Sequence, residues 1–429
     1  MPENDRVAFI GLGAMGYPMA GHLQASGYLV TVYNRTTAKA EAWYRQYGGE
    51  LARTPAAAAK HADIVFVCVG NDSDVTAVVT GDDGVMAGIQ AGATIVDHTT
   101  TSRQLAQELD VLAQAQDVAF LDAPVSGGQA GAENGALTVM VGGNDANLQR
   151  VQAAINCYSR HTQLMGPVGY GQLTKMVNQL CIAGVLGGLA EAYHFAECAG
   201  LDIKAVAEAI QGGAAQSWQM NNRSNTVADA QYDFGFAIDW MRKDLGFALD
   251  VAQELGLHLE IAHLVDSQYS TVQALGGNRW DTSGLIEAIR QRTRDLANKG
   301  ERVTHQGGCH CGDVKWSIEA PPVLDTHTCN CSICNINHYQ HFIVPKSRFH
   351  LLSDSEISAC YRFGSGIAEH YFCRRCGVKS YYVPRSNPDG VSVNVRCIHS
   401  DTVKAIYDTP FDGQNWEKNA DTLAHLSKA

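Results

Sequence analysis

Seven of the thirteen cysteines stand in three close groups near the end of the chain. These groups are Cys309-His-Cys311, Cys329-Asn-Cys331-Ser-Ile-Cys334 and Cys373-Arg-Arg-Cys376. Thiols two or three positions apart can converge on one tetrahedral ion, and zinc favours sulfur ligands at such spacings. A long chain with closely paired thiols favours metal binding over disulfide bonds. The C-terminal region is therefore predicted to be a zinc domain.

A glycine-rich turn follows the first apolar run of the chain. It consists of Gly11, Leu12, Gly13, Ala14, Met15 and Gly16, which is the pattern G-x-G-x-x-G. Glycines allow a tight turn and a close approach of backbone amides and a helix N-terminus to a pyrophosphate. The motif alone is a weak signal, but its position after a first strand predicts a dinucleotide site.

The end of the second apolar run bears on the choice of cofactor. An NAD enzyme usually has an acidic residue there for the ribose hydroxyl, whereas this chain has Asn34, Arg35 and Thr36. Arginine and two small polar groups suit a 2′-phosphate, so NADP(H) is predicted in preference to NAD(H). The alternative is that Arg35 only stacks on the adenine.

The elements that must position these groups follow from the apolar pattern. Short β-branched runs alternate with alanine-rich stretches up to about residue 143, which predicts a parallel sheet covered by helices. These runs are Val7–Ile10, Leu29–Tyr33, Ile64–Val69, Thr94–Val96 and Ala119–Leu121. Residues 171–200 then read as one long apolar helix, which suggests an all-α domain with a buried dimer contact. Beyond a short polar stretch, aromatic and β-branched residues predict a small β-rich domain.

The expected fold class is an α/β Rossmann domain plus an all-α domain, followed by a small β-rich zinc-binding domain. The expected bounds are 1–165 for the nucleotide domain, 166–298 for the helical substrate and dimerisation domain, 299–302 for a linker and 303–429 for the zinc domain.

Composition excludes several classes of partner. The net charge of −12 lies wholly before residue 303, because residues 303–429 contain 12 basic and 12 acidic side chains. Neither part has a basic stripe, so no nucleic-acid partner is expected. We expect no signal peptide and no membrane-spanning segment, and hence a cytoplasmic protein.

Four ordered motifs over residues 6–295 resemble the β-hydroxyacid dehydrogenase family, which includes 3-hydroxyisobutyrate dehydrogenases and tartronate semialdehyde reductases. The first is the glycine turn, continued as Tyr-Pro-Met-Ala. The others are Asp122-Ala-Pro-Val-Ser-Gly-Gly128, Gly169-Tyr-Gly-Gln-Leu-Thr-Lys-Met-Val-Asn178 and Lys243-Asp-Leu245.

The resemblance implies a proton-transfer role for Lys175, which would serve the oxygen of the reacting carbon. General acid–base catalysis by lysine works best when burial and neighbouring charge pull its pKa toward neutrality. Asn178 lies one helical turn further and would orient the substrate or the lysine. A plain packing hydrogen bond is the alternative for Asn178.

The resemblance also implies the binding residues. Ser126, Gly127 and Gly128 would hold the substrate carboxylate, while Thr100 and Lys243 would contact the cofactor, with a surface role as the alternative for these last two. The substrate would be a short polar β-hydroxy acid or its semialdehyde, and the chain would form a homo-oligomer through the helical domain.

Residues 303–429 are similar to the glutathione-dependent formaldehyde-activating family, and closer still to its centromere protein V branch. The likeness rests on the cysteine groups, on residues 341–348 and 382–388, and on Phe411-Asp-Gly-Gln-Asn-Trp416-Glu. It implies two zinc ions. The four-thiolate structural site would consist of Cys309, Cys311, Cys373 and Cys376, and the open site of Cys329, Cys331 and Cys334.

In that reading, glutathione sulfur would bind the open zinc as a thiolate and attack an aldehyde. Two alternatives remain: His327, His338 or His341 closes the site as an inert fourth ligand, or the domain is a non-catalytic interaction module. The sequence thus predicts an NADP(H)-dependent oxidoreductase with a possible second, carbon–sulfur lyase activity.

Overall fold

The computed structural model describes residues 5–299 and 302–428. The chain divides into two compact units, the first ending at Ala288 and the second beginning at Ile289.

A mixed sheet forms the first half of the first unit. Its strands are β1 (Arg6–Ile10), β2 (Leu29–Tyr33), β3 (Glu50–Leu51), β4 (Ile64–Val67), β5 (Thr94–Asp97), β6 (Ala119–Asp122), β7 (Val125–Ser126), β8 (Leu137–Gly142) and β9 (Ser159–Gly166). The order is β3-β2-β1-β4-β5-β6-β8-β7, with β9 beside β8. The five apolar runs of the sequence all became strands. Residues buried on both faces explain why β4 reads as a continuous apolar run.

The five predicted runs form a parallel sheet as expected, and strands that were not predicted make one edge of it mixed. Strands β1 to β6 pair in parallel, but β8 runs antiparallel to both β6 and β7. Strand β7 follows β6 after only two residues, and residues 127–136, which include the short α7, then lead into β8; this connection is shorter than the roughly dozen or more residues that a crossover to a parallel neighbour requires.

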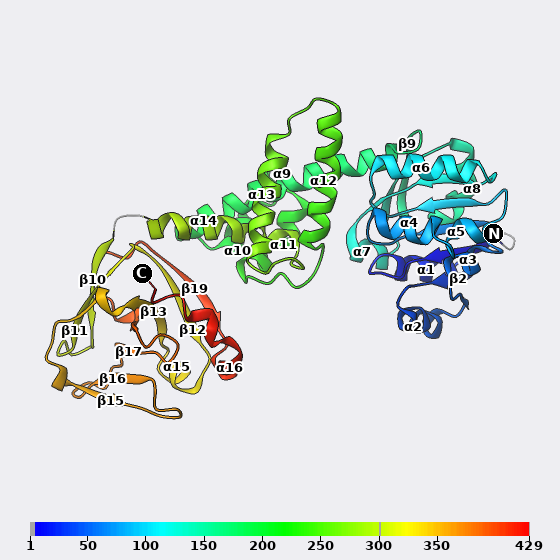
Figure 1. Ribbon diagram of the computed structural model, residues 1–429. Coiled ribbons are helices and arrows are strands. Elements are labelled where there is room, and N and C mark those ends of the chain that lie inside the picture. The colour runs from blue at the N-terminus through cyan, green and yellow to red at the C-terminus, as the bar shows by residue number, and fades with distance from the viewer. Residues whose placement is uncertain (1–4, 300–301, 429) are drawn as a thin grey trace. The chain divides into compact units, whose positions relative to one another are not determined.

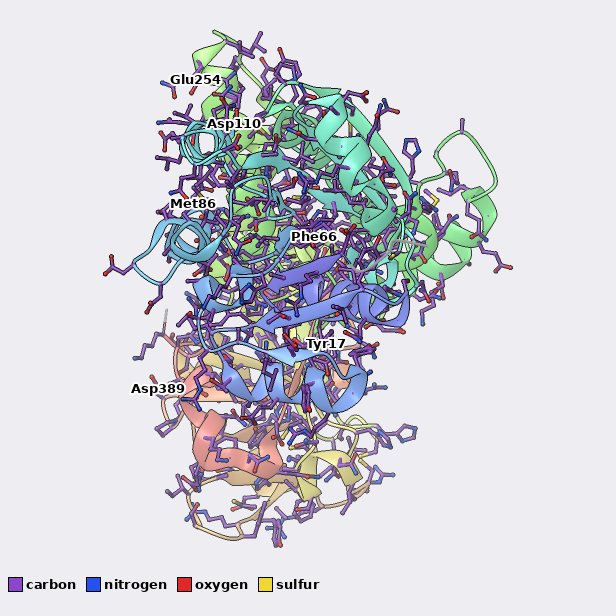
Figure 2. The ribbon with its side chains drawn as sticks, turned by 90° about the vertical axis from the view of Figure 1, so that its right-hand side faces the viewer. Tyr17, Phe66, Met86, Asp110, Glu254 and Asp389 are labelled. Carbon is purple, nitrogen blue, oxygen red and sulfur yellow. The ribbon has the colours of Figure 1, made fainter. Side chains whose placement is uncertain are left out.

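Helices cover the sheet on both faces. They are α1 (Gly16–Ala25), α2 (Thr37–Tyr47), α3 (Pro55–Ala59), α4 (Asp72–Thr80), α5 (Val85–Gly88), α6 (Arg103–Gln114), α7 (Gly128–Glu133) and α8 (Asp145–Ile155). Phe66 on β4 is fully buried and lies among the side chains of the sheet core (Figure 2). It stacks on Phe9 of β1 with 5.9 Å between ring centroids. Strand core and helix cover together make the predicted Rossmann domain.

A bundle of helices completes the first unit. Its members are α9 (Tyr170–Cys198), α10 (Ile203–Ile210), α11 (Trp218–Ala228), α12 (Ile238–Glu254), α13 (Glu260–Ala274), the 3-10 turn η1 (Thr282–Leu285) and the start of α14 (Ile286–Lys299). The long helix α9 leads from the sheet into this bundle (Figure 1). Its N-terminal part packs on β8 and β9, and it also contacts α12 and α13. One helix therefore belongs to both halves of the unit.

Among the described residues, α9 is also long and apolar enough to cross a membrane by length and composition, contrary to the sequence expectation. That test is also met by core helices of globular domains. Buried polar side chains on α9, including Gln172, Lys175 and Gln179, have partners or charges inside this unit. Buried polar contacts thus join one face of α9 to the rest of this unit, and 33% of its most apolar window is buried.

The second unit is rich in β-structure. One sheet has the order β10 (Val303–Gly308), β11 (Lys315–Ala320), β14 (Phe349–Leu351). The other has the order β15 (Ser358–Tyr361), β16 (Glu369–Cys373), β17 (Tyr381–Val383), β18 (Gly390–Asn394), β13 (Gln340–Pro345), β12 (Val323–Cys329), β19 (Ala405–Phe411). Two short helices, α15 (Ser332–Ile336) and α16 (Trp416–Asn419), and the 3-10 turns η2 (Lys346–Arg348), η3 (Ser355–Ile357), η4 (Val395–Cys397), η5 (Gly413–Asn415) and η6 (Ala420–Leu423) complete it.

The predicted linker of residues 299–302 lies partly outside the described residues, because Gly300 and Glu301 are not described. Lys299 is the last residue of α14, and Arg302 directly precedes β10. The predicted fold class is confirmed: a Rossmann domain, a helical domain and a small β-rich domain with cysteine clusters follow one another along the chain.

Candidate functional site

The glycine turn joins β1 to α1, and its three glycines differ in what surrounds them. A Cβ on Gly11 would lie 2.2 Å from the carbonyl oxygen of Cys68, and one on Gly16 would lie 2.1 Å from that of Gly11. A Cβ on Gly13 would meet no atom of the described chain within 4 Å. The first and third glycines are therefore required by the fold itself. The second faces open space, as a turn that lets a pyrophosphate approach the backbone requires.

Residues at the end of β2 make hydrogen bonds that stabilise the glycine turn. The side-chain oxygen of Asn34 accepts a hydrogen bond from the Leu12 amide at 2.9 Å, and its amide group donates to the Thr36 carbonyl at 3.0 Å. The Arg35 side chain is 85% exposed and pairs with the carboxylate of Asp74 at 2.9 Å. Of the three predicted 2′-phosphate residues, Asn34 thus has a structural task, and Arg35 offers the mobile charge.

Lys175 is buried in the second turn of α9, where it is 7% exposed. Burial lowers the pKa of its ammonium, the carboxylate of Asp244 opposes this effect and the charge of Lys243 adds to it. Burial conversely raises the pKa of Asp244. Gln179, one turn beyond Lys175, donates a hydrogen bond from its amide to Asp244 at 2.7 Å. The result is a buried lysine held beside a buried, hydrogen-bonded carboxyl group.

Asn178 extends this chain of polar groups toward the predicted carboxylate-binding loop. Its amide donates to the side-chain oxygen of Gln179 at 2.7 Å, and its own oxygen lies 3.5 Å from the Ser126 hydroxyl. Gly127 and Gly128 follow in the left-handed region, with φ of 131° and 62°, and Gly128 begins α7. The structure therefore brings Ser126 and Asn178 together.

The N-terminus of α9 is fixed by Asp122 at the end of β6. One carboxylate oxygen accepts from the Gly169 amide at 2.7 Å and the other from the Gln172 amide at 2.8 Å. Free amide groups at a helix start need such acceptors, and a carboxylate also suits the positive end of the helix dipole. Asp122 thereby sets where the helix begins and so where Lys175 lies relative to the sheet.

Thr100 and Lys243 meet at the carboxyl end of the sheet. The Lys243 ammonium donates to the Thr100 carbonyl at 2.5 Å and to the Gly70 carbonyl at 3.2 Å. It also lies 3.2 Å from a carboxylate oxygen of Asp244. Lys243 is therefore not a surface group: it ties α12 to two loops that follow sheet strands.

Four residues of this site were not among those predicted from the sequence: Asp122, Gln172, Gln179 and Asp244. Gln172 is fully buried and bonds the loop after β5, accepting from the Thr101 amide at 3.1 Å and donating to the Thr99 carbonyl at 2.8 Å. Positions 172, 175 and 179 lie on one stripe of a helix, and all three are buried. Polar residues repeated along a buried stripe of an apolar helix are the signal that would have found two of the four.

In the second unit, the four predicted structural cysteines do converge. Their sulfur atoms all lie within 4.8 Å of one another, with Cys311 3.5 Å from Cys309 and 3.6 Å from Cys373. The β10–β11 turn supplies the first pair, the last residue of β16 is Cys373, and the turn after β16 supplies Cys376. Backbone amides of Val314 and Arg375 point at two of the sulfurs, at 3.2 and 3.4 Å. Four clustered thiols with amide donors fit a closed tetrahedral zinc site.

The three remaining predicted ligands form a second cluster at the end of β12 and the start of α15. The sulfur atoms of Cys329, Cys331 and Cys334 also lie within 4.8 Å of one another, and among the described residues no histidine nitrogen belongs to this group. The alternative in which His327, His338 or His341 closes the site thus lacks support in this geometry. A Cβ on Gly413 would lie 2.2 Å from the Cys329 sulfur, so a glycine is required where the chain covers the cluster. Three thiols fit a zinc ion with one open position.

A dinucleotide turn, a buried lysine and a helical bundle define the first unit as a nicotinamide-dependent dehydrogenase of the Rossmann type. Residues 6–166 match the sequence model of the NAD-binding domain of 6-phosphogluconate dehydrogenase, and residues 169–289 that of NADP-dependent 3-hydroxyisobutyrate dehydrogenase. An uncharacterized oxidoreductase of Shewanella frigidimarina is 62% identical over 67% of this chain and 98% of its own length. A probable 3-hydroxyisobutyrate dehydrogenase-like protein of Arabidopsis thaliana is 36% identical over 68% of this chain and 86% of its own.

A solved structure supports the same family assignment for the first unit. The 3-hydroxyisobutyrate dehydrogenase of Mycobacterium tuberculosis with L-serine superimposes with a TM-score of 0.62 and 27% identity, covering 67% of this chain and all of its own. Residues 304–409 match the glutathione-dependent formaldehyde-activating enzyme family. The chain therefore belongs to the 3-hydroxyisobutyrate dehydrogenase-like β-hydroxyacid dehydrogenase family, and a formaldehyde-activating-type domain is fused to its C-terminal end.

Proposed function

We propose that the first unit interconverts a short β-hydroxy acid and its semialdehyde with NADP(H), and that Lys175 moves the proton. The observation that supports this most is the buried Lys175 beside Asp244, because burial lowers the lysine pKa and brings it nearer the range useful for acid–base catalysis. The bound nicotinamide would supply or accept the hydride. Lys175 would give a proton to the carbonyl oxygen during reduction and take it from the hydroxyl during oxidation.

The other predicted residues are proposed to orient the substrate. Ser126 with the backbone of Gly127 and Gly128 offers a hydroxyl and amides suited to a carboxylate. Asn178 would position the reacting end, since it joins Ser126 to the Gln179–Asp244 pair. The L-serine of the M. tuberculosis structure is itself a small β-hydroxy acid, which supports this substrate class.

The test of this function is a panel of short β-hydroxy acids and semialdehydes assayed with NADP(H) and NAD(H). Lys175→Ala is expected to lower kcat by at least about 10²-fold, the usual lower contribution of general acid–base catalysis, while NADPH still binds. Lys204→Ala is the matched control, because that lysine is half exposed and pairs with Asp229. Full turnover by Lys175→Ala would remove the proposed role.

The preference for NADP(H) is proposed from Arg35. Its exposed guanidinium can leave Asp74 for a 2′-phosphate, since exposed ion pairs contribute only about 0–1 kcal/mol. We expect Arg35→Ala to reduce kcat/KM with NADPH by about tenfold or more and to leave the value with NADH nearly unchanged. Asp74→Asn, which frees the arginine, should raise NADPH affinity up to about fivefold. A strong preference of the wild type for NADH would contradict the assignment.

We also propose the domain bounds 1–165, 166–298, 299–302 and 303–429. We further propose a cytoplasmic location and a homo-oligomer that forms through the helical domain. Exposed apolar side chains in the bundle support the oligomer: Phe195 on α9 is 73% exposed and Ile261 on α13 is 65% exposed. Contiguous exposed apolar surface commonly marks interaction sites, so these helices are where a subunit contact would be tested.

For the second unit we propose two zinc ions and a thiol-dependent aldehyde activity, with glutathione as the candidate thiol. The open trio supports this, because a zinc ion with three thiolate ligands keeps a position for an incoming thiolate. The second candidate is a non-catalytic, zinc-stabilised interaction module. Cys331→Ala separates the two: it should abolish thiol-dependent formaldehyde consumption in the first case and alter only association in the second. One zinc ion per full chain after gentle purification would remove the catalytic proposal.

A further inference from the structure

A group of buried polar side chains that lack hydrogen-bond partners within residues 5–299 and 302–428 adjoins the cysteine trio. The unpartnered atoms are the Lys379 ammonium, the Nε2 of His341 and both ring nitrogens of His370. The three side chains are 7%, 5% and 4% exposed. Buried polar groups in native proteins almost always have hydrogen-bond partners, so such a group indicates a ligand that would provide them.

Lys379 contacts two aromatic rings that pack in the same apolar cluster as the cysteine trio. Its ammonium lies 4.5 Å from the ring centroids of both Tyr339 and Tyr382. These two rings pack in one apolar cluster with Cys329 and Cys334. Contact with ring faces stabilises a cation without using its hydrogen-bond donors. All three N–H groups of the ammonium are thus unused next to the trio.

His341 and His370 pack against the same pair of tyrosine rings. His370 stacks on Tyr382 with 5.0 Å between centroids and an interplanar angle of 4°. His341 lies 4.6 Å from the Tyr339 ring, and its Nδ1 lies 3.1 Å from the Tyr382 hydroxyl. Burial lowers the pKa of His341 to about 3 and that of His370 to about 4, so both rings are neutral at physiological pH. Among these three side chains, Lys379 is therefore the cation. Burial lowers its pKa to about 8, and the charges of the three cysteines oppose that effect.

We propose that Lys379 is the oxyanion-binding residue of the trio site: it binds the negatively charged oxygen of a ligand whose sulfur occupies the open metal position. This inference rests on the proposed function of the trio. When the sulfur of a thiolate attacks an aldehyde carbon, a carbon–sulfur bond forms and the π electron pair of the carbonyl moves to oxygen. The Lys379 ammonium stabilises that oxygen and gives it a proton. The product is a hemithioacetal, and the proton that the thiol released to solvent when it became a thiolate returns to the amine.

A plain structural alternative is that Lys379 only neutralises the negative charge of a metal with three thiolates. The two roles differ in what they do to ligands. A neutralising charge acts equally on every thiolate that binds, whereas an oxyanion-binding residue favours ligands that have an anionic oxygen beside the sulfur. Mercaptoacetate and ethanethiol form a suitable pair of probes, because both can place a thiolate on the metal but only the first has an anionic oxygen.

The experiment is calorimetric titration of the zinc-loaded full chain with each thiol. Wild-type protein is expected to bind mercaptoacetate at least tenfold more tightly than ethanethiol. Lys379→Met should reduce that ratio to near one with ethanethiol affinity unchanged within twofold, and the exposed control Lys346→Met should keep the wild-type ratio. A wild-type ratio near one, an unchanged ratio in Lys379→Met, or equal weakening of both thiols overturns the inference. If Lys379→Met fails to retain two zinc ions, Lys379→Gln and the wild-type ratio provide the same decision.

A second readout separates this inference from the proposed activity. Thiol-dependent formaldehyde consumption is measured on the same proteins. If the wild type consumes no formaldehyde but its thiol preference depends on Lys379, the lyase proposal fails and the anion site stands. If the wild type and Lys379→Met consume formaldehyde at equal rates, the activity stands and the role of Lys379 is refuted.

Discussion

The three glycines of the dinucleotide turn provide a paired test of fold against function. Gly16→Ala would put a Cβ 2.1 Å from the Gly11 carbonyl oxygen and 2.9 Å from a ring carbon of Phe9. Backbone cannot yield easily there, and overpacking of this kind costs about 1–3 kcal/mol. At about 2–4 °C per kcal/mol for a domain of this size, the melting temperature should fall by about 2–12 °C.

Gly13→Ala should behave in the opposite way, because its Cβ meets no described atom within 4 Å. We expect its stability to match that of the wild type within about 0.5 kcal/mol, as for surface substitutions. The methyl group would instead occupy the space proposed for the pyrophosphate. Loss of one charge-assisted amide contact, about 1.5–3 kcal/mol, would weaken NADPH binding by about ten- to a hundredfold.

The assay combines thermal unfolding by circular dichroism with NADPH titration by intrinsic fluorescence, on the full chain in both cases. The reasoning is refuted by a Gly13→Ala protein that binds NADPH as tightly as the wild type, because the open space would then not be the cofactor's. A Gly16→Ala protein with an unchanged melting temperature would equally show that the packing argument is wrong.

Further predictions concern the lysine, its helix and the zinc sites. Because the pKa of Lys175 is lowered and its protonated form serves reduction, kcat for reduction should fall as pH rises through a pKa below 10.5, and kcat for oxidation should rise; a flat pH–rate profile would contradict this. Gln179→Leu removes a hydrogen bond that lowers the pKa of Asp244, so this carboxyl group becomes less ionised. A weaker negative charge lowers the pKa of Lys175, and the pH–rate profile should shift to lower pH. A shift to higher pH would speak against an effect of Asp244 on Lys175. Asp122→Ala leaves two amides of α9 without acceptors and should cost about 1–3 kcal/mol of unfolding free energy, measured by urea denaturation; a loss below about 0.5 kcal/mol would deny the anchoring role. Cys373→Ser should lower zinc content from two ions per chain to one and destabilise the second unit, while NADPH binding persists; unchanged zinc by atomic absorption would disprove the four-thiolate assignment.

The fold was largely predictable because its signals are local. Apolar runs such as Leu29–Tyr33 became strands with those bounds, because β-branched residues favour strands and the alternate residues Val30 and Val32 are buried on one face. The antiparallel strand β8 was not predicted, because strand direction depends on pairing across the sheet and on the length of the β7–β8 connection. The three cysteine groups were visible from their spacing, whereas the convergence of Cys309 and Cys311 with Cys373 and Cys376 was expected only from the family resemblance.

The environment of the site was less predictable. That Asn34 supports the Leu12 amide depends on a contact 22 residues away along the chain, which residue type does not reveal. Asp244 appeared in a recognised motif only as a neighbour of Lys243, and its link to Gln179 on another helix requires the packing of α12 on α9. The unpartnered Lys379 has no motif at all, since an ammonium between two rings is a property of the folded domain.

The single long helix α9 has a consequence for how the first unit can move. At 1.5 Å per residue, its 29 residues span about 43 Å, so a small tilt of the far end would sweep a large arc there. Lys175 lies only five residues after the start, close to the anchor that Asp122 provides. A tilt of α9 about this anchored start would therefore displace Phe195 by several times the distance that it displaces the lysine. The end of α9 that contains the proposed proton-transfer residue would therefore move least.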